Sequence, residues 1–357
     1  MIYKSTLSRS AATLGLAMGL GVFGAAAEGN MTFVSYGGSF QEAQEKALVK
    51  PFAEADQVNV VTDSGPSVAK IKAMVEAGNV QWDVVEVTEA DYLNLVRLDL
   101  IEPIDYSKFD EATLKAIEPR FRPDRGVVAV MYSYGIAYRT DGNRSSHPTS
   151  YAELWDTEAF PGPRALPAGT FANPPWEAAL LAAGTPADKL YPIDLDKALA
   201  SLDKIKPSVS VWFDNTAQGV QALISGDVDY GLMPNGRVLQ AKAEGAPVEF
   251  EYGQALLYSD YFVVPKGAPN KENAMAFLAF ASQAKPSAEF MKQIQYSMPN
   301  TDALQYLDPE YAKALPIAPE NINRQIPVTG EFYGEDAGNG KTWQQVTIDA
   351  WNRWYGR

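Results

Sequence analysis

The 357-residue sequence contains no cysteine and only one histidine, His147. The absence of cysteine excludes disulfide bonds, thiolate metal sites and a cysteine nucleophile. A single histidine, here in the polar stretch RSSHPTS, cannot build both a catalytic triad and a metal site, so we interpret it as an exposed loop residue. Nucleophile-elbow, P-loop and zinc-protease motifs are missing too, and no G-x-G-x-x-G follows a predicted strand. We therefore expect a protein that is not an enzyme and that uses no cofactor.

Signals for a metal site are equally poor. No stretch is dense enough in oxygen ligands to form a calcium-binding loop. Asp227 and Asp229 flank a predicted strand, and we interpret them as solvated charges rather than as an acid/base pair. Tyr132 and Tyr134 have the side-chain chemistry of ferric-iron ligands, but no adjacent tyrosine pair or nearby histidine accompanies them. We expect no metal site.

Positive charge is scarce, because 30 lysine and arginine residues face 44 aspartates and glutamates, for a formal net charge of −14. This balance argues against nucleic acid and anionic membrane surfaces as partners. It is compatible with a cationic ligand, although an acidic surface also serves solubility.

Only one long apolar run occurs. The stretch AATLGLAMGLGVFGAAA follows Lys4 and Arg9 and ends in the Ala25-Ala26-Ala27 pattern of a signal-peptidase site. The alternative, a membrane anchor, is disfavoured because the run is short and rich in glycine and alanine. We predict a signal peptide over residues 1–27 and a periplasmic mature protein. Lys4 and Arg9 are the only charges of this segment, so its removal changes the net charge from −14 to −16.

After residue 27, strand-like and helix-like segments alternate, which predicts an α/β protein with parallel strands covered by helices. Two long strands, at 126–139 and 255–265, would carry the chain into a second lobe and back, as a hinge requires. Ser39 is expected to cap a helix, with Glu42 completing a capping box. The other strands are predicted at 31–36, 58–65, 82–88, 163–167, 208–213 and 228–233, and the other helices at 67–78, 194–206, 215–225, from 236, and twice within 272–294.

Ligands of open α/β sheets bind beyond the carboxyl ends of strands. The loops at 36–39, 86–89, 212–215 and 235–237, together with the surroundings of Asp260, are therefore candidate binding segments. One of them is unusual. Helix N-termini favour anions, yet MPNGRVLQA places Arg237 in the first turn of a predicted helix.

Six stretches in order over most of the chain carry a family resemblance. They are SYGGSFQEA, WDVVEVTEADYLNLVRLDLIEPID, SYAELWDTEAFPGPRALP, ISGDVDYGLMPNGRVLQA, YSDYFVVPKGAPNKENAMAFLAFA and YSMPNTDAL. The sequence resembles the periplasmic solute-binding proteins of bacterial ABC importers, in particular the putrescine/spermidine-binding group. The resemblance implies a two-lobed α/β fold of the type II, Venus-flytrap class, in which hinge strands join two mixed sheets flanked by helices. We expect lobe 1 at 28–138 plus 257–305 and lobe 2 at 139–256 plus 306–357.

The sequence departs from the polyamine-binding pattern at one position. In that group the loop matching MPNGRVLQA carries tryptophan, glycine and then an aspartate that pairs with one end of the ligand. Here Pro234 stands near the tryptophan position and Arg237 at the aspartate position, whereas the second family aspartate is retained as Asp260. A guanidinium matches a carboxylate bidentately, and Asp260 still favours an ammonium. The implied ligand is a zwitterionic ω-amino acid such as γ-aminobutyrate (GABA), and the sequence is also similar to the GABA-binding branch of the group.

Further residues are assigned to the same site by their position. The candidate aromatic walls and hydrogen-bond donors are Tyr36, Trp176, Trp212, Tyr258, Tyr296, Ser39 and Thr88. Three alternatives stay open. Arg237 can instead face solvent, Glu244 or Glu249, and Asp214 or Glu177 can replace Asp260. The ligand can be a polyamine, an opine or a betaine. The resemblance implies a monomer that closes on its ligand and delivers it to an inner-membrane ABC permease.

Overall fold

The computed structural model describes residues 29–141, 146–338 and 340–356. The predicted signal peptide lies outside these residues. No helix of the described segments combines the length and the hydrophobicity that crossing a bilayer requires.

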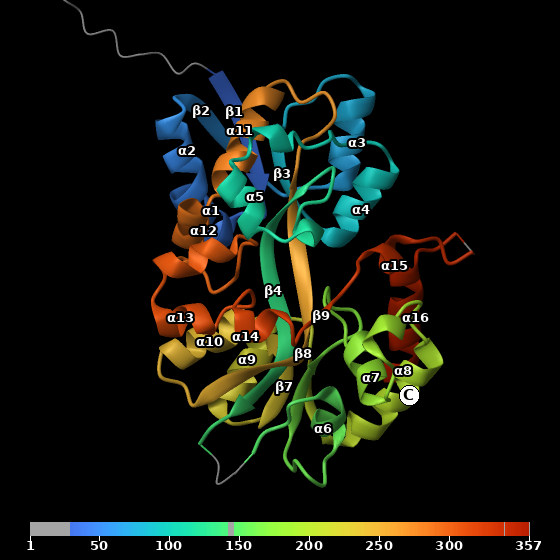
Figure 1. The fold of residues 1–357 in the computed structure, drawn as a ribbon. Coiled ribbons are helices and arrows are strands. Elements are labelled where there is room, and N and C mark those ends of the chain that lie inside the picture. The colour runs from blue at the N-terminus through green and yellow to red at the C-terminus, as the bar shows by residue number, and fades with distance from the viewer. Residues whose placement is uncertain (1–28, 142–145, 339, 357) are drawn as a thin grey trace, which may run out of the picture.

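A single sheet of nine strands runs through the whole molecule (Figure 1), in the order β2-β1-β3-β8-β4-β7-β5-β6, with β9 beside β8. Strands β1, β2 and β3 are parallel to one another at one end, and β5, β6 and β7 are parallel at the other. The strands are β1 (Gly29–Ser35), β2 (Val58–Ser64), β3 (Val84–Thr88), β4 (Val127–Arg139), β5 (Arg164–Pro167), β6 (Val209–Phe213), β7 (Tyr230–Pro234), β8 (Val248–Val263) and β9 (Ile326–Pro327).

The long strands β4 and β8 join the two lobes. They pair antiparallel from Val127 opposite Phe262 to Arg139 opposite Val248, with two register shifts. Figure 1 shows both strands passing from the upper, first lobe into the lower, second lobe. The prediction that two long strands connect the lobes is confirmed, although β8 begins earlier than the expected 255 because VEFEY extends it.

Helices cover both faces of the sheet in each lobe, as the alternation of strands and helices predicts. In the first lobe they are α1 (Gly38–Gln44), α2 (Lys50–Ala55), α3 (Val68–Glu76), α4 (Glu89–Arg97), α5 (Glu111–Ala116), α11 (Lys271–Ala281) and α12 (Ala284–Met291). In the second lobe they are α6 (Tyr151–Trp155), α7 (Trp176–Ala182), α8 (Leu195–Ile205), α9 (Thr216–Ser225), α10 (Asn235–Ala243) and α16 (Trp343–Tyr355).

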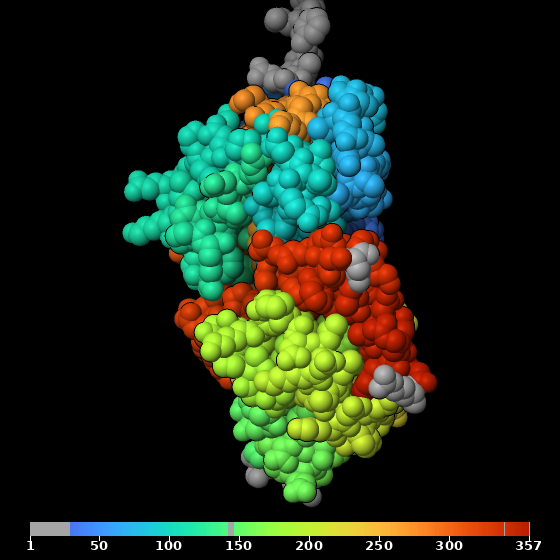
Figure 2. Space-filling model, turned by 90° about the vertical axis from the view of Figure 1, so that its right-hand side faces the viewer, coloured from blue at the N-terminus to red at the C-terminus, as the bar shows by residue number. Residues whose placement is uncertain are grey.

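Three short helices, α13 (Pro309–Lys313), α14 (Pro319–Ile322) and α15 (Glu331–Gly334), lie on the path that returns the chain to the second lobe. Figure 2 shows this C-terminal segment between the blue-green first lobe and the yellow-green second lobe. Leu307, Leu315 and Ile317 are buried with first-lobe side chains, beyond the expected crossing at residue 305, while the Tyr252 hydroxyl of β8 donates to the Ala314 carbonyl at 2.7 Å. The lobe limits given above remain a prediction.

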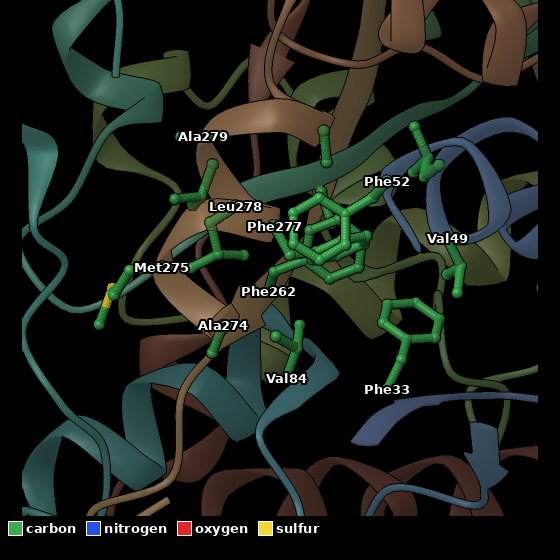
Figure 3. Packing of buried hydrophobic residues seen from close by; sticks show 14 of the residues in the cluster. Phe33, Val49, Phe52, Val84, Phe262, Ala274, Met275, Phe277, Leu278 and Ala279 are labelled. Atoms are coloured by element: carbon green, nitrogen blue, oxygen red, sulfur yellow. The ribbon is translucent and has the colours of Figure 1, made fainter. Parts of the chain in front are cut away.

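The core of the first lobe occupies both faces of its sheet, because neighbouring strand residues point to opposite sides. Phe33 packs with Phe262 and Phe277 on one face (Figure 3), whereas Val34, next to Phe33 in the chain, is buried on the other. The second lobe repeats the arrangement with Ile136 and Ala137 of β4. Strands buried on both faces explain the near-continuous apolar runs of the sequence.

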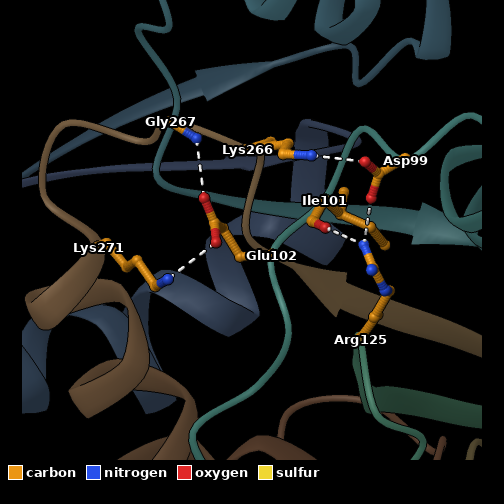
Figure 4. Close-up of polar contacts among 7 residues, drawn as sticks. All are labelled: Asp99, Ile101, Glu102, Arg125, Lys266, Gly267 and Lys271. Atoms are coloured by element: carbon orange, nitrogen blue, oxygen red, sulfur yellow. Dashed lines mark hydrogen bonds and ion pairs between the residues drawn. The ribbon is translucent and has the colours of Figure 1, made fainter.

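Ion pairs fasten the outer end of the first lobe (Figure 4). Asp99 accepts from Lys266 and Arg125 at 2.5 and 2.8 Å, and Glu102 accepts from Lys271 at 2.8 Å. They link the loop after α4 to the segment before β4, to the loop after β8 and to the start of α11. Asp99 and Lys266 are exposed and Glu102 is half-buried, so these surface pairs contribute little to stability. The group lies away from the cleft described below.

Two local predictions are wrong. Helix α1 begins at Gly38 after Gly37, and Ser39 makes no capping hydrogen bond; the Gln41 side chain instead accepts from the Gly37 N–H at 2.9 Å. Gly37 and Gly38 both have positive φ, so the helix begins two residues earlier than the Ser39–Glu42 spacing indicates. His147 is not an exposed loop residue either, because it is half-buried and stacked on Tyr138 with ring centres 4.0 Å apart.

Candidate ligand-binding cleft

The candidate site is a cleft where the lobes meet, beyond the carboxyl ends of β1, β3 and β7 and beside the middle of β4 and β8. Its first cavity has a volume of about 330 Å³, at the lower end of the range for ligand pockets. Both lobes line it, through Tyr36, Phe40, Val130, Tyr132, Tyr134, Phe171, Asn173, Thr216, Pro234, Arg237, Asp260 and Tyr296.

The stretch Pro234-Asn235-Gly236-Arg237 builds one end of this cavity. Pro234 ends β7 and precedes the first turn of α10. The buried Asn235 side chain accepts from the Ser133 N–H at 2.9 Å and donates to the Gln295 carbonyl at 3.0 Å, so it fixes the helix start to both neighbouring segments. A Cβ on Gly236 would lie 2.7 Å from the Tyr296 ring, so glycine is what allows Tyr296 to rest against the helix.

Arg237 projects from that first turn into the cavity. Its charge acts on the Tyr134 and Tyr296 hydroxyls, where it lowers both pKa values against the rise that burial causes. Among the described residues no carboxylate pairs with Arg237; Glu244 accepts from Gln240, and Glu249 is bonded to Lys242. The guanidinium is therefore solvent-exposed within the cleft, at the positive end of a helix, without an acidic partner from the described chain.

Asp260 forms the opposite pole. It lies on β8 opposite Thr88 of β3 and Val130 of β4, and only 9 % of its surface is exposed. Within the described parts of the chain, its carboxylate receives no hydrogen bond and joins no ion pair. Burial raises its pKa well above the usual value, and the negative charges of Glu86, Asp91 and Glu89 raise it further. A buried carboxylate of this kind gains most from a cation that comes with the ligand.

Glu86 adds to this negative region from behind the cavity wall. It is fully buried on β3, and the Ser35 hydroxyl and the Gln44 amide donate to its Oε2 at 2.6 and 2.7 Å. Its Oε1 has no hydrogen-bond partner within the described structure. Burial raises the pKa of Glu86 to about 7, against the two hydrogen bonds that lower it.

Aromatic rings line the space between the two poles. Tyr132 and Tyr258 face each other across β4 and β8 and stack with ring centres 5.5 Å apart. Tyr132 also contacts Tyr296, with ring centres 5.7 Å apart, and Tyr36 lies beside Phe40. Such rings can pack the methylene groups of a ligand and face its cation. Of the predicted aromatic walls, Tyr36 and Tyr296 line the first cavity, and Tyr258 lines a second cavity that adjoins it.

The structure places three predicted site residues elsewhere. Trp176 is fully buried at the start of α7 and packs against Trp351, and Trp212 of β6 packs against Trp351 and Trp354. Both tryptophans therefore belong to the second-lobe core beneath the C-terminal helix α16, where Trp176 is fully buried and Trp212 is half-buried. Ser39 is exposed on α1 and lines neither cavity.

Thr88 caps α4 by accepting from the Asp91 N–H at 3.2 Å, and it lines the second cavity. Neither alternative partner for a ligand amine lines the cleft. Asp214 is exposed, and Glu177 is fully buried, accepting from the hydroxyls of Tyr191 at 2.8 Å and Tyr333 at 2.7 Å.

Several cleft residues were not among the predicted ones. Tyr132 and Tyr134 are two positions apart on β4, so both face the cleft, and this spacing within a hinge strand was the available signal. Phe171 and Asn173 lie in an irregular segment after β5, and Thr216 follows β6. Nothing in their local sequence distinguishes the first two from other loop residues.

Residues 47–319 match the model of the bacterial extracellular solute-binding proteins.

The chain belongs to this family.

The GABA-binding protein of Pseudomonas aeruginosa is 36% identical over 321 residues, covering 87% of this chain and 89% of the relative. The spermidine/putrescine-binding periplasmic protein of Escherichia coli is 25% identical over 317 residues, covering 85% and 88%. A solved GABA receptor superposes with a TM-score of 0.77 at 35% identity, covering 91% of this chain and 96% of that one. The two-lobed fold expected of an extracellular solute-binding protein is thus confirmed. The relatives are solute-binding proteins by name, and several are components of ABC transporters.

Proposed function

We propose that this solute-binding protein captures GABA or a close ω-amino acid in the first cavity. The observation that carries the proposal is the pair of opposite charges in one cavity, Arg237 and Asp260, neither of which has an ion-pair partner in the described chain. The carboxylate of the ligand would meet the Arg237 guanidinium and the N–H groups that begin α10. Its ammonium would meet Asp260, with Tyr132 and Tyr296 along the methylene chain.

The opposite charges of Arg237 and Asp260 favour an ω-amino acid over a diamine as the ligand. Each ammonium is costly to desolvate without an acceptor, and a diamine bound here would place one of its ammonium groups against a guanidinium. The names of the relatives agree with this choice, because the GABA-binding protein is more similar to this chain than the spermidine/putrescine-binding protein is. Polyamine, opine and betaine ligands remain the competing hypotheses.

Binding would be reversible and would involve no covalent chemistry. Arg237 comes from the second lobe, whereas Asp260 lies on the first-lobe half of β8, so a ligand between them would bridge both lobes and favour closure. The closed receptor would then deliver its ligand to an inner-membrane ABC permease. We further propose that the mature protein works in the periplasm as a monomer, after removal of residues 1–27.

Calorimetric titration with GABA, 5-aminovalerate and putrescine tests the proposal. We expect GABA or 5-aminovalerate to bind and putrescine to bind far more weakly. Tight binding of putrescine with none of GABA would refute the proposal and leave only the family assignment. Mass analysis of the ligand after incubation should return it unchanged, whereas turnover would indicate an enzyme.

A further inference from the structure

The cleft does not end at Asp260. A second cavity of about 320 Å³ adjoins the first, and the two share Tyr132, Phe171, Asn173 and Asp260 as common walls. An ω-amino acid held between Arg237 and Asp260 would lie in the first cavity and end where the second begins. The second cavity therefore has room for a group that is bonded to the nitrogen of the ligand.

The charges around the second cavity favour a cation. Glu89 and Asp91, from the first turn of α4, line it together with Asp260. Burial raises the pKa of Glu89 to about 7 and also raises the pKa of Asp91, although a hydrogen bond with the Thr88 side chain opposes the latter shift. No described lysine or arginine forms an ion pair with any of the three carboxylates.

Among the described residues of its lining, Arg97 is the one cationic side chain, and neutral acceptors hold its guanidinium in place. It donates to the Asn94 side chain at 2.9 Å and to the Gly334 carbonyl at 3.4 Å. Glu89 has a single neutral donor, the Gly330 N–H at 3.2 Å. An ammonium at Asp260 would leave Glu89 and Asp91 without a donor from the ligand. A guanidinium carries the same charge but spreads five N–H donors over a larger group, so it can reach more than one of these carboxylates.

Aromatic rings complete the cavity. Tyr258 and Tyr333 line it, and the Tyr333 hydroxyl is fixed from behind by its 2.7 Å hydrogen bond to the buried Glu177. Tyr258 is held by its stacking on Tyr132. Positioned rings beside carboxylates suit a planar guanidinium, because its faces stack on aromatic groups while its edges donate to carboxylates.

We propose that the second cavity binds a guanidinium at the end of the ligand, so that the receptor takes ω-guanidino acids in addition to, and in preference to, simple ω-amino acids. This inference rests on the proposed function, since the ligand carboxylate would occupy the same place at Arg237. Asp260 would then contact the guanidinium at the junction of the cavities, and Asp91 would contact its far edge.

Calorimetry with 4-guanidinobutyrate and GABA on the same full chain tests the inference. The wild type should bind 4-guanidinobutyrate at least tenfold more tightly than GABA. Asp91→Asn should weaken 4-guanidinobutyrate at least tenfold and GABA less than threefold, because the change removes a charge from the second cavity alone. Ile348→Phe narrows the same cavity from α16 and should have the same selective effect, while Glu289→Gln on the surface of α12 serves as the matched charge control.

The outcomes are distinguishable. Binding of GABA without binding of 4-guanidinobutyrate overturns the inference and leaves the proposed function standing. Failure of both ligands to bind overturns the proposed function together with the inference. Tight binding of 4-guanidinobutyrate that neither Asp91→Asn nor Ile348→Phe changes would place the guanidinium outside the second cavity and overturn the assignment.

Discussion

Replacement of Arg237 by alanine gives the sharpest test of the bipolar cleft. The side chain is exposed within the cleft and has no ion-pair partner among the described residues, so its removal should change the free energy of unfolding by less than about 0.5 kcal/mol. The effect on binding should be large. Truncation of one partner of a desolvated charge pair costs about 2–5 kcal/mol, and the exposure of Arg237 places this pair in the lower half of that range. A loss of about 2–3 kcal/mol corresponds to GABA affinity about 30–150-fold weaker.

The measurement is a calorimetric dissociation constant for GABA beside a thermal melt of the same preparation. Arg353→Ala is the matched control, because Arg353 is an exposed arginine of the same lobe on α16, outside both cavities of the cleft. It should bind GABA like the wild type. If Arg237→Ala melts normally and binds GABA within threefold of the wild type, Arg237 does not contact the ligand and the reasoning fails.

Three other substitutions separate binding from stability. Asp260→Asn keeps the shape of the side chain but removes its buried charge. GABA should then bind at least tenfold more weakly by calorimetry, while the melting temperature stays equal or rises. A lower melting temperature with unchanged GABA affinity would contradict this. Glu86 has a folded-state pKa of about 7 against an ordinary 4.5, so the folded protein loses about 3 kcal/mol of stability as the pH rises from 4.5 through 7. Thermal melts of Glu86→Gln should therefore show a gain relative to the wild type at pH 8 that is absent at pH 4, and an equal difference at both would refute it. Trp176→Ala should cost about 3–5 kcal/mol of stability. At temperatures where the variant is folded, its GABA affinity should stay within twofold of the wild type. A larger loss of affinity would show that Trp176 contacts the ligand.

Most of the fold could be predicted because the apolar pattern of the strands is strong. The hinge strand β4 was expected at 126–139 and spans Val127–Arg139, and α9 was expected at 215–225 and spans Thr216–Ser225. The errors lie where local rules compete. Ser39 and Glu42 have capping-box spacing, but two glycines with positive φ begin the helix before them.

The candidate site was predictable only in part, and for a physical reason. Arg237 and Asp260 were identified from where they depart from or keep a family pattern, and both line the same cavity. For Trp176 and Trp212 the sequence could not distinguish a place in the cleft from a place in the core, because tryptophans in both environments have the same local sequence pattern. Trp212 lies on a strand and still faces the C-terminal helix, whose packing no nearby residue specifies. Residues of irregular loops, such as Phe171, belong to no helical or strand periodicity, so no sequence pattern indicates which way they face.

The continuity of the sheet through both lobes has a consequence for how the protein unfolds. Val130 of β4 is buried in the first-lobe core, and Ile136 of the same strand is buried in the second-lobe core. Unfolding of either core would therefore release a strand that is also part of the other core. Chemical denaturation should therefore be a single cooperative event. Trp82 lies in the first-lobe core and the other six tryptophans belong to the second lobe, so tryptophan fluorescence and far-ultraviolet circular dichroism of the wild type should report one shared midpoint.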